Sequence, residues 1–197
     1  MTIFYRLGSK LYINITNSCP CACVFCIRNQ TNSVGDAESL WLEREPSVKE
    51  IIQEFEKQHN WDGIDEIVFC GYGEPMMRAG DVIDLSIYIK SKVNLPVRIN
   101  TNGLVKLIDQ SFELSKLKII DSISVSLNAD DADEYLRLVK PCFGICSYNA
   151  MLDFVTEAKE YTAVILTVLE DLAPNRINNC RNIASELGIP LRIRAYM

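Results

Sequence analysis

The chain has 197 residues, of which 48% are hydrophobic and 23% are charged, so it is long enough to bury a sizeable core as one globular domain spanning residues 1–197. A net charge of −6 argues against non-specific binding to nucleic acid, and no apolar run is long enough to span a bilayer. Residues 1–10 lack a secretory signal, so we expect a cytoplasmic protein whose eight cysteines are thiols or metal ligands rather than disulfides.

Strand-like and helix-like segments alternate from one end of the chain to the other. Short apolar or alternating runs predict six strands, at residues 11–16, 66–70, 97–101, 122–127, 163–168 and 191–195. Helical periodicity predicts a helix that begins after Ser47, and further helices at residues 81–93, 104–117, 149–159 and 174–187. Ser47 and Glu50 form a capping box, and the last helix begins with Pro174 and ends before Gly188.

This alternation is typical of a parallel sheet with helices packed outside it. Six strand–helix units are too few to close an eight-stranded barrel. We therefore predict an α/β fold built on a six-stranded parallel partial (βα) barrel, that is, an incomplete TIM-like barrel. In barrels of this type the functional site lies at the carboxyl ends of the strands, and polar residues follow each predicted strand of this chain.

Three cysteines follow the first predicted strand in the spacing CxxxCxxC. Cys19, Cys23 and Cys26 offer three thiolates from one short loop, and Phe25 precedes the last of them. A cubane iron–sulfur cluster has four irons, so three ligands leave one iron open for a small molecule, whereas four cysteines usually make an electron carrier. The loop also contains Cys21, which could take the place of a mutated ligand.

This cysteine spacing, with an aromatic residue in that position, resembles the signature of the radical S-adenosylmethionine (SAM) superfamily. The resemblance implies a [4Fe-4S] cluster held by Cys19, Cys23 and Cys26, whose open iron chelates the amino and carboxylate groups of SAM. It also implies that Phe25 lies against the adenine. Residues 29–46 form the longest irregular stretch, which we expect to wrap the cluster loop or the mouth of the site.

The segment after the second predicted strand resembles the GGEP motif of the same superfamily. It consists of Gly71, Tyr72, Gly73, Glu74 and Pro75. Glycines allow a close approach of the backbone, and carbonyl groups and a carboxylate accept hydrogen bonds from an ammonium group. The resemblance therefore implies that this motif binds the methionine end of SAM.

Further polar residues follow the third and fourth predicted strands and lie on the sixth. Asn102, Ser124, Ser126 and Asn128 match strand-end positions that contact the ribose and the methionine carboxylate in the superfamily, although satisfying the loop backbone is the competing interpretation. Arg192 and Arg194 share one face of the last strand, where they hold a carboxylate or phosphate or form a solvated edge.

The remaining cysteines have simpler explanations. Cys70 and Cys180 fall on apolar faces and are expected to be buried small hydrophobes. Cys142 and Cys146 are four residues apart, but two thiols make an incomplete metal site.

The motifs as a set resemble the short radical SAM proteins called TatD-associated, and this resemblance covers nearly all of the chain. It implies reductive cleavage of SAM to a 5′-deoxyadenosyl radical that abstracts hydrogen from an unidentified substrate. It further implies an electron donor such as flavodoxin or ferredoxin, and a link to a TatD-type hydrolase. The alternatives are a glycyl-radical activase of a partner protein, an enzyme similar to 7-carboxy-7-deazaguanine synthase, and a non-catalytic iron–sulfur electron carrier or sensor.

Overall fold

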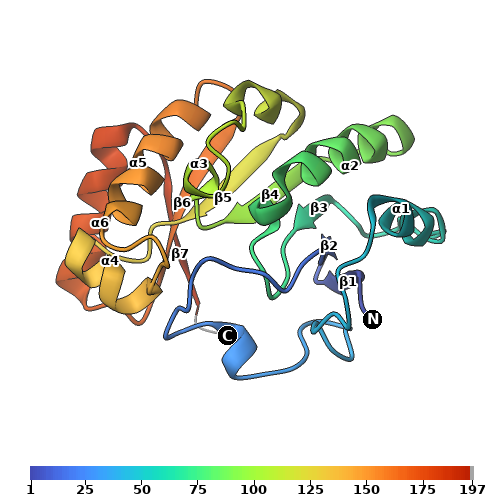
Figure 1. The fold of residues 1–197 in the computed structure, drawn as a ribbon, viewed down its shortest axis with the longest axis horizontal. Helices are drawn as coiled ribbons and strands as arrows, with labels where there is room; N and C mark the ends of the chain where they lie inside the picture. The colour runs from blue at the N-terminus through green and yellow to red at the C-terminus, as the bar shows by residue number, and fades with distance from the viewer. Residues whose placement is uncertain (196–197) are drawn as a thin grey trace.

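A computed structural model describes residues 1–195 of the chain. It contains a seven-stranded sheet in which every strand pairs with its neighbours in chain order (Figure 1). The strands are β1 (Phe4–Leu7), β2 (Lys10–Ile13), β3 (Glu66–Phe69), β4 (Val97–Thr101), β5 (Ser122–Ser126), β6 (Ala163–Leu169) and β7 (Leu191–Arg194). Strands β2 to β7 pair in parallel, and within the described residues no pairing joins β1 to β7, so the curved sheet stays open.

The six predicted strands are confirmed as β2 to β7, with ends that differ by a few residues. The prediction lacked β1, which runs antiparallel to β2 and extends the sheet beyond the six parallel strands. Only Tyr5 of this four-residue strand is fully buried, so its sequence carries little alternation. The connection to β2 is a tight turn in which Gly8 adopts a positive φ of 60°.

Helices connect the parallel strands and lie outside the sheet (Figure 1). The α-helices are α1 (Val48–Glu56), α2 (Ala79–Lys92), α3 (Val105–Ile108), α4 (Ala132–Val139), α5 (Cys146–Ala158) and α6 (Pro174–Leu187). The short 3-10 helices are η1 (Ile27–Asn29), η2 (Pro75–Arg78) and η3 (Leu114–Ile119). The Ser47–Glu50 capping box is present in both directions, and Gly188 ends α6 in the left-handed conformation, as predicted.

Two helix predictions need correction. The single helix expected at residues 104–117 is broken into α3 and η3, because Asp109 leaves the helical conformation and its carboxylate accepts a hydrogen bond from the backbone N–H of Ser111. Helix α4 was missed, although Asp131 caps its first turn and Tyr135 and Val139 bury one face at a spacing of four residues. Helix α5 also begins three residues earlier than expected.

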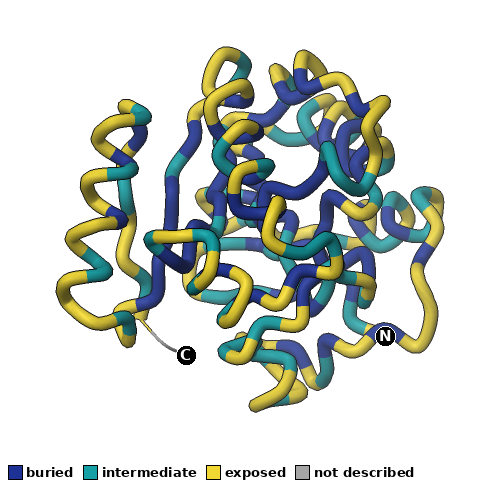
Figure 2. The backbone as a smooth tube through the Cα atoms, turned by 60° about the vertical axis from the view of Figure 1, so that its left-hand side comes forward, coloured by how far each residue is buried: buried dark blue, intermediate teal, exposed yellow. Residues whose placement is uncertain are grey.

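The main hydrophobic core lies between the sheet and the helices that cover it, and Figure 2 shows the buried strands running through the middle of the molecule. A second, smaller core holds the irregular segment 30–47 against the sheet, through Tyr5, Ala37, Leu40 and Tyr72. In the part of the chain that the structure describes, no helix has both the length and the apolar character needed to cross a bilayer.

Candidate functional site

The carboxyl ends of β2 to β7 meet around a pocket of ≈ 230 Å³. Parallel strands place these ends at one edge of the sheet, so loops far apart in the sequence converge there. Of the predicted site residues, the pocket is lined by Cys19, Cys23, Phe25, Cys26, Gly71, Tyr72, Gly73, Glu74, Asn102, Ser126 and Asn128. Two predicted site residues, Ser124 and Pro75, do not line it.

The loop with the three cysteines is attached to the end of α4. The backbone N–H of Val24 donates to the carbonyl of Leu138 at 2.9 Å, and Cys21 forms an isolated β-bridge with Pro141. The next residue, Cys142, donates its N–H to the carbonyl of Pro20 at 2.8 Å. This short backbone pairing fixes the path of the loop, so its thiols are held on the pocket side rather than displayed to solvent.

Cys21 lies among the predicted ligands, with only 4% of its surface exposed. Hydrogen bonding with Cys21 lowers the pKa of Cys19 to about 6, and it also lowers the pKa of Cys23. Burial raises the pKa of Cys26. The amide of Asn102 donates to the Cys21 sulfur at 3.6 Å. The lowered pKa values favour the thiolate forms of Cys19 and Cys23.

Cys19, Cys23 and Cys26 supply thiols, the donor type that iron–sulfur clusters use. Among residues 1–195, no three thiol, imidazole or carboxylate side chains converge on one point as a single metal ion requires. A cubane cluster places each cysteine on a different iron, so its ligands need not converge in that way. The pocket beside the cysteines also contains two buried oxygen atoms, Asn128 Oδ1 and Tyr135 Oη, that have no partner in the described residues. These atoms are suited to a bound polar ligand.

Gly71 and Gly73 are required by close packing against the chain that enters the cysteine loop. A Cβ at Gly71 would overlap the side chain of Asn14, and a Cβ at Gly73 would overlap the carbonyl of Thr16 and come within 2.7 Å of the carbonyl of Ser18. The backbone N–H of Glu74 also donates to the Ser18 carbonyl at 2.8 Å. The two glycines therefore bring the GYGEP segment into contact with the cysteine loop.

Glu74 is buried, and its carboxylate joins two strand-end loops. It accepts hydrogen bonds from the Thr101 hydroxyl and the Asn102 backbone N–H, each at 2.7 Å, and from the Met76 backbone N–H at 3.0 Å. Burial raises its pKa to about 7 despite these bonds. A carboxylate has about four acceptor sites, so three internal bonds leave one for a ligand.

The side chains of the other two members of this segment are fixed by contacts with the rest of the chain. The Tyr72 hydroxyl donates to the carbonyl of Thr31, and its ring meets the ring of Trp41 edge-on at 5.1 Å between centroids. Pro75 is buried at the start of η2. These contacts hold the irregular segment 30–47 against the GYGEP segment.

Asn128 lines the pocket, whereas Ser124 lies outside its lining. Asn128 adopts a positive φ of 55°, which is uncommon for a residue other than glycine. It lines both the pocket and an adjoining cavity of ≈ 410 Å³, and Phe25 lies in the shared wall. The Ser124 hydroxyl instead accepts a hydrogen bond from Arg192 at 3.1 Å. Asn128 is therefore placed to meet a ligand, whereas Ser124 fixes a side chain.

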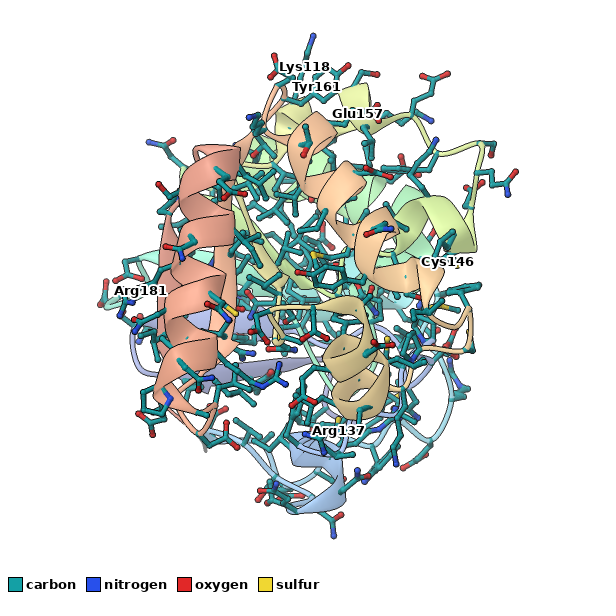
Figure 3. The ribbon with its side chains drawn as sticks, turned by 90° about the vertical axis from the view of Figure 1, so that its left-hand side faces the viewer. Lys118, Arg137, Cys146, Glu157, Tyr161 and Arg181 are labelled. Atoms are coloured by element: carbon teal, nitrogen blue, oxygen red, sulfur yellow. The ribbon has the colours of Figure 1, made fainter. Side chains whose placement is uncertain are left out.

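Some pocket residues were missed, or were given another role, by sequence reasoning. Tyr135 lines the pocket, and the Asp131 cap and apolar spacing of α4 would have located it. Cys70 is only half-buried and lines the pocket, which corrects its expected place in the core, whereas Cys180 is fully buried as predicted. Cys146 is exposed at the start of α5 (Figure 3).

Comparison with known proteins places this site in a known family. The Radical SAM superfamily model matches residues 13–172, which span β2 to β6 and include the cysteine loop and the GYGEP segment. Probable dual-specificity RNA methyltransferase RlmN of Gloeobacter violaceus is 28% identical over 123 residues, or 61% of this chain and 33% of the relative. The enzyme of the same name from Trichodesmium erythraeum is 23% identical over 146 residues, or 74% of this chain and 39% of the relative.

Solved structures agree on the fold. TYW1 with a lysine-pyruvate adduct bound superposes with a TM-score of 0.63 at 16% identity, over 96% of this chain and 65% of that chain. Native anSMEcpe with bound AdoMet superposes with a TM-score of 0.63 at 13% identity, over 94% of this chain and 50% of that chain. The chain spans less than half the length of the curated relatives it matches. With the family model covering most of its length, the chain belongs to the radical SAM superfamily.

Proposed function

We propose that this chain is a radical SAM enzyme that binds one [4Fe-4S] cluster through Cys19, Cys23 and Cys26 and cleaves SAM reductively to abstract hydrogen from its substrate. The observation that carries the proposal is the pocket in which these cysteines meet the GYGEP loop and the unpartnered Asn128 oxygen. When bound, the cluster supplies the electron that releases the 5′-deoxyadenosyl radical and methionine from SAM.

The residues of the chain bind and orient the cofactor in this proposal. Phe25, in the wall shared by the two cavities, packs against the adenine. The Gly71–Gly73 backbone and the remaining acceptor site of Glu74 bind the methionine ammonium group. The polar side chains at the ends of β4 and β5 contact the ribose and the methionine carboxylate, and they are Asn102, Ser126 and Asn128. Ser124 contributes indirectly, because its hydroxyl holds Arg192.

The walls of the pocket protect a reactive radical from water. Tyr72 fixes the irregular segment on one side, and α4 with its bound cysteine loop closes another. Sequestration of this kind limits side reactions of reactive intermediates. The larger cavity adjoins the pocket and shares Phe25, Asn128 and Leu169 with it, which offers a place for a substrate.

For the finer assignment, we propose the TatD-associated group of radical SAM proteins, with flavodoxin or ferredoxin as electron donor and a TatD-type hydrolase as a linked protein. The motifs from β2 to β5 support this assignment. Methyl transfer to RNA, suggested by the names of the two curated relatives, is the competing function. Those relatives match only over part of their length, and the net charge of −6 does not favour an RNA partner.

Anaerobic reconstitution with iron and sulfide tests the proposal. After reduction, we expect an electron paramagnetic resonance signal of a [4Fe-4S] cluster that shifts on addition of SAM, and we expect formation of 5′-deoxyadenosine. A cluster signal that does not change when SAM is added would instead indicate an electron carrier or sensor.

Matched cysteine variants assign the ligands. Replacing Cys19, Cys23 or Cys26 with Ala should abolish 5′-deoxyadenosine formation, whereas Cys142→Ala, at an exposed position, should leave it unchanged. Because Cys21 lies beside Cys19 and Cys23, each ligand variant is also made in a Cys21→Ala background, which removes the substitute thiol. Full activity of the double variants would exclude the assigned ligands.

A further inference from the structure

Among residues 1–195, the guanidinium of Arg194 has no counter-ion. Arg194 lies at the end of β7 and lines the same pocket as the cysteines. Its Nε atom is buried and has no hydrogen-bond partner within the described residues, and no carboxylate of residues 1–195 forms an ion pair with the side chain. Loss of solvent lowers the pKa of Arg194, which shows that the charged form bears a cost at this position.

The charged groups nearby do not compensate this cation. Arg98, which also faces the barrel interior, is already paired with Glu66 at 3.0 Å. Arg192 lies two residues before Arg194 on the same face of β7 and adds a second positive charge, and its hydrogen bond to Ser124 is to a neutral partner. Burial raises the pKa of the Cys70 thiol, so that thiol stays neutral beside Arg194.

A half-buried guanidinium without a counter-ion is costly, and it becomes favourable when an anion binds to it. Arginine offers a rigid fork of N–H donors that matches carboxylate and phosphate groups in a bidentate manner. We propose that Arg194 binds a carboxylate or phosphate group of the substrate in this pocket. The proposal rests on the proposed function, and it names the substrate class as a small anionic molecule.

SAM is the other source of a carboxylate in this pocket. In the proposed function the cluster would hold the methionine end of SAM, and the SAM titration described below decides whether Arg194 contacts the carboxylate of SAM. The pocket of ≈ 230 Å³ opens next to the cavity of ≈ 410 Å³, and the two share the lining residues Phe25, Asn128 and Leu169. Arg194 lines the smaller of the two cavities, so a substrate anchored there can extend into the larger one.

Titration of the reconstituted full chain with inorganic phosphate tests the proposal, after unbound iron has been removed. Calorimetry should detect phosphate binding to the wild-type chain. Arg194→Gln should weaken it by about ten- to a hundredfold, because a hydrogen-bonded charge pair is lost. Arg194→Lys keeps the positive charge but cannot form a bidentate pair, so its phosphate affinity should lie between those of the wild type and Arg194→Gln. Arg181→Gln is the matched control, since Arg181 is exposed on the outer helix α6 (Figure 3) and should leave phosphate binding unchanged.

A parallel titration with SAM separates the two sources of the anion. SAM affinity of Arg194→Gln should stay within about twofold of the wild type, because a lost charge-assisted bond would exceed that change. A loss of SAM affinity equal to the loss of phosphate affinity would overturn the proposal and assign the arginine to the methionine carboxylate. Equal phosphate binding by the wild type, Arg194→Gln and Arg181→Gln would also overturn it. A failure of the proposed function would appear separately, as the absence of a cluster signal before any titration.

Discussion

The carboxylate of Glu74 accepts a hydrogen bond from the hydroxyl group of Thr101 at 2.7 Å, across 27 residues of sequence. The same carboxylate binds the backbone N–H of Asn102, so the loop after β3 and the loop after β4 are joined at a buried point beside the pocket. The GYGEP segment therefore has a structural role that precedes any contact with a ligand.

Glu74→Ala should destabilise the chain by about 3 kcal/mol or more, because three buried donors lose their acceptor at a cost of roughly 1–3 kcal/mol each. Glu74→Gln keeps one oxygen but turns an amide donor toward another donor, and we expect a loss of about 1–2 kcal/mol. Urea unfolding of the cluster-free chain measures both. Glu157→Ala, at an exposed position of α5 (Figure 3), should change stability by less than about 0.5 kcal/mol. Equal effects at residues 74 and 157 would contradict the burial of Glu74.

The stability contribution of Glu74 should depend on pH. Burial raises the pKa of Glu74 from 4.5 to about 7, so the folded chain binds the proton more tightly than the unfolded chain. The stabilisation that Glu74 contributes is therefore fully present below about pH 4.5 and is lost as the pH rises through about 7. The shift corresponds to about 3 kcal/mol. The free energy of unfolding of the wild type, measured relative to Glu74→Gln, should fall across this window. A constant difference between the two proteins would show that Glu74 titrates normally.

Gly73→Ala should weaken cluster assembly, since the added Cβ has no space between the GYGEP segment and the cysteine loop. Iron and sulfide content after reconstitution should fall well below that of the wild type, together with the melting temperature. Gly80→Ala is the matched control. Gly80 lies in α2 with no atom within 4 Å of its added Cβ, so the change should stabilise the chain by up to about 1 kcal/mol. Normal iron content in Gly73→Ala would contradict the packing argument.

The ion pair between Arg98 and Glu66 should be important for stability. The two side chains pair at 3.0 Å, with 6% and 15% of their surfaces exposed, and Lys10 binds Glu66 at 2.5 Å. Glu66→Gln leaves a buried guanidinium without its anion, and we expect a loss of about 3 kcal/mol in thermal or urea unfolding.

This ion pair also has a predicted pH dependence. Burial acts to raise the pKa of Glu66, but the hydrogen bonds from Arg98 and Lys10 outweigh it and leave the pKa lowered. The stabilisation is therefore present above the unfolded value and is lost as the pH falls through the lowered folded pKa. In a double-mutant cycle, Glu66→Gln should have a much smaller effect in an Arg98→Met background. If the two substitutions changed the free energy of unfolding additively, Glu66 and Arg98 would not stabilise the chain as an ion pair.

Local signals in the sequence predicted most of the scaffold. Strand periodicity predicted the six parallel strands, and the Ser47–Glu50 box and Gly188 marked helix ends correctly, because capping and periodicity depend on residues within one or two turns. The errors lie where local patterns are ambiguous. The apolar spacing at residues 104–117 continues through a turn at Asp109, and β1 has only four residues.

The sequence by itself determined the family, because the CxxxCxxC spacing and the GYGEP segment are short local motifs that keep their meaning without coordinates. Only the tertiary structure decided how the pocket is built. It brings Cys21 into contact with Asn102, joins Glu74 to Thr101 and places the Arg192 guanidinium against Ser124. It also places Arg194 where no carboxylate of residues 1–195 pairs with it. These relationships join residues 27 to 81 positions apart, and they depend on sheet curvature and burial, which no local pattern encodes.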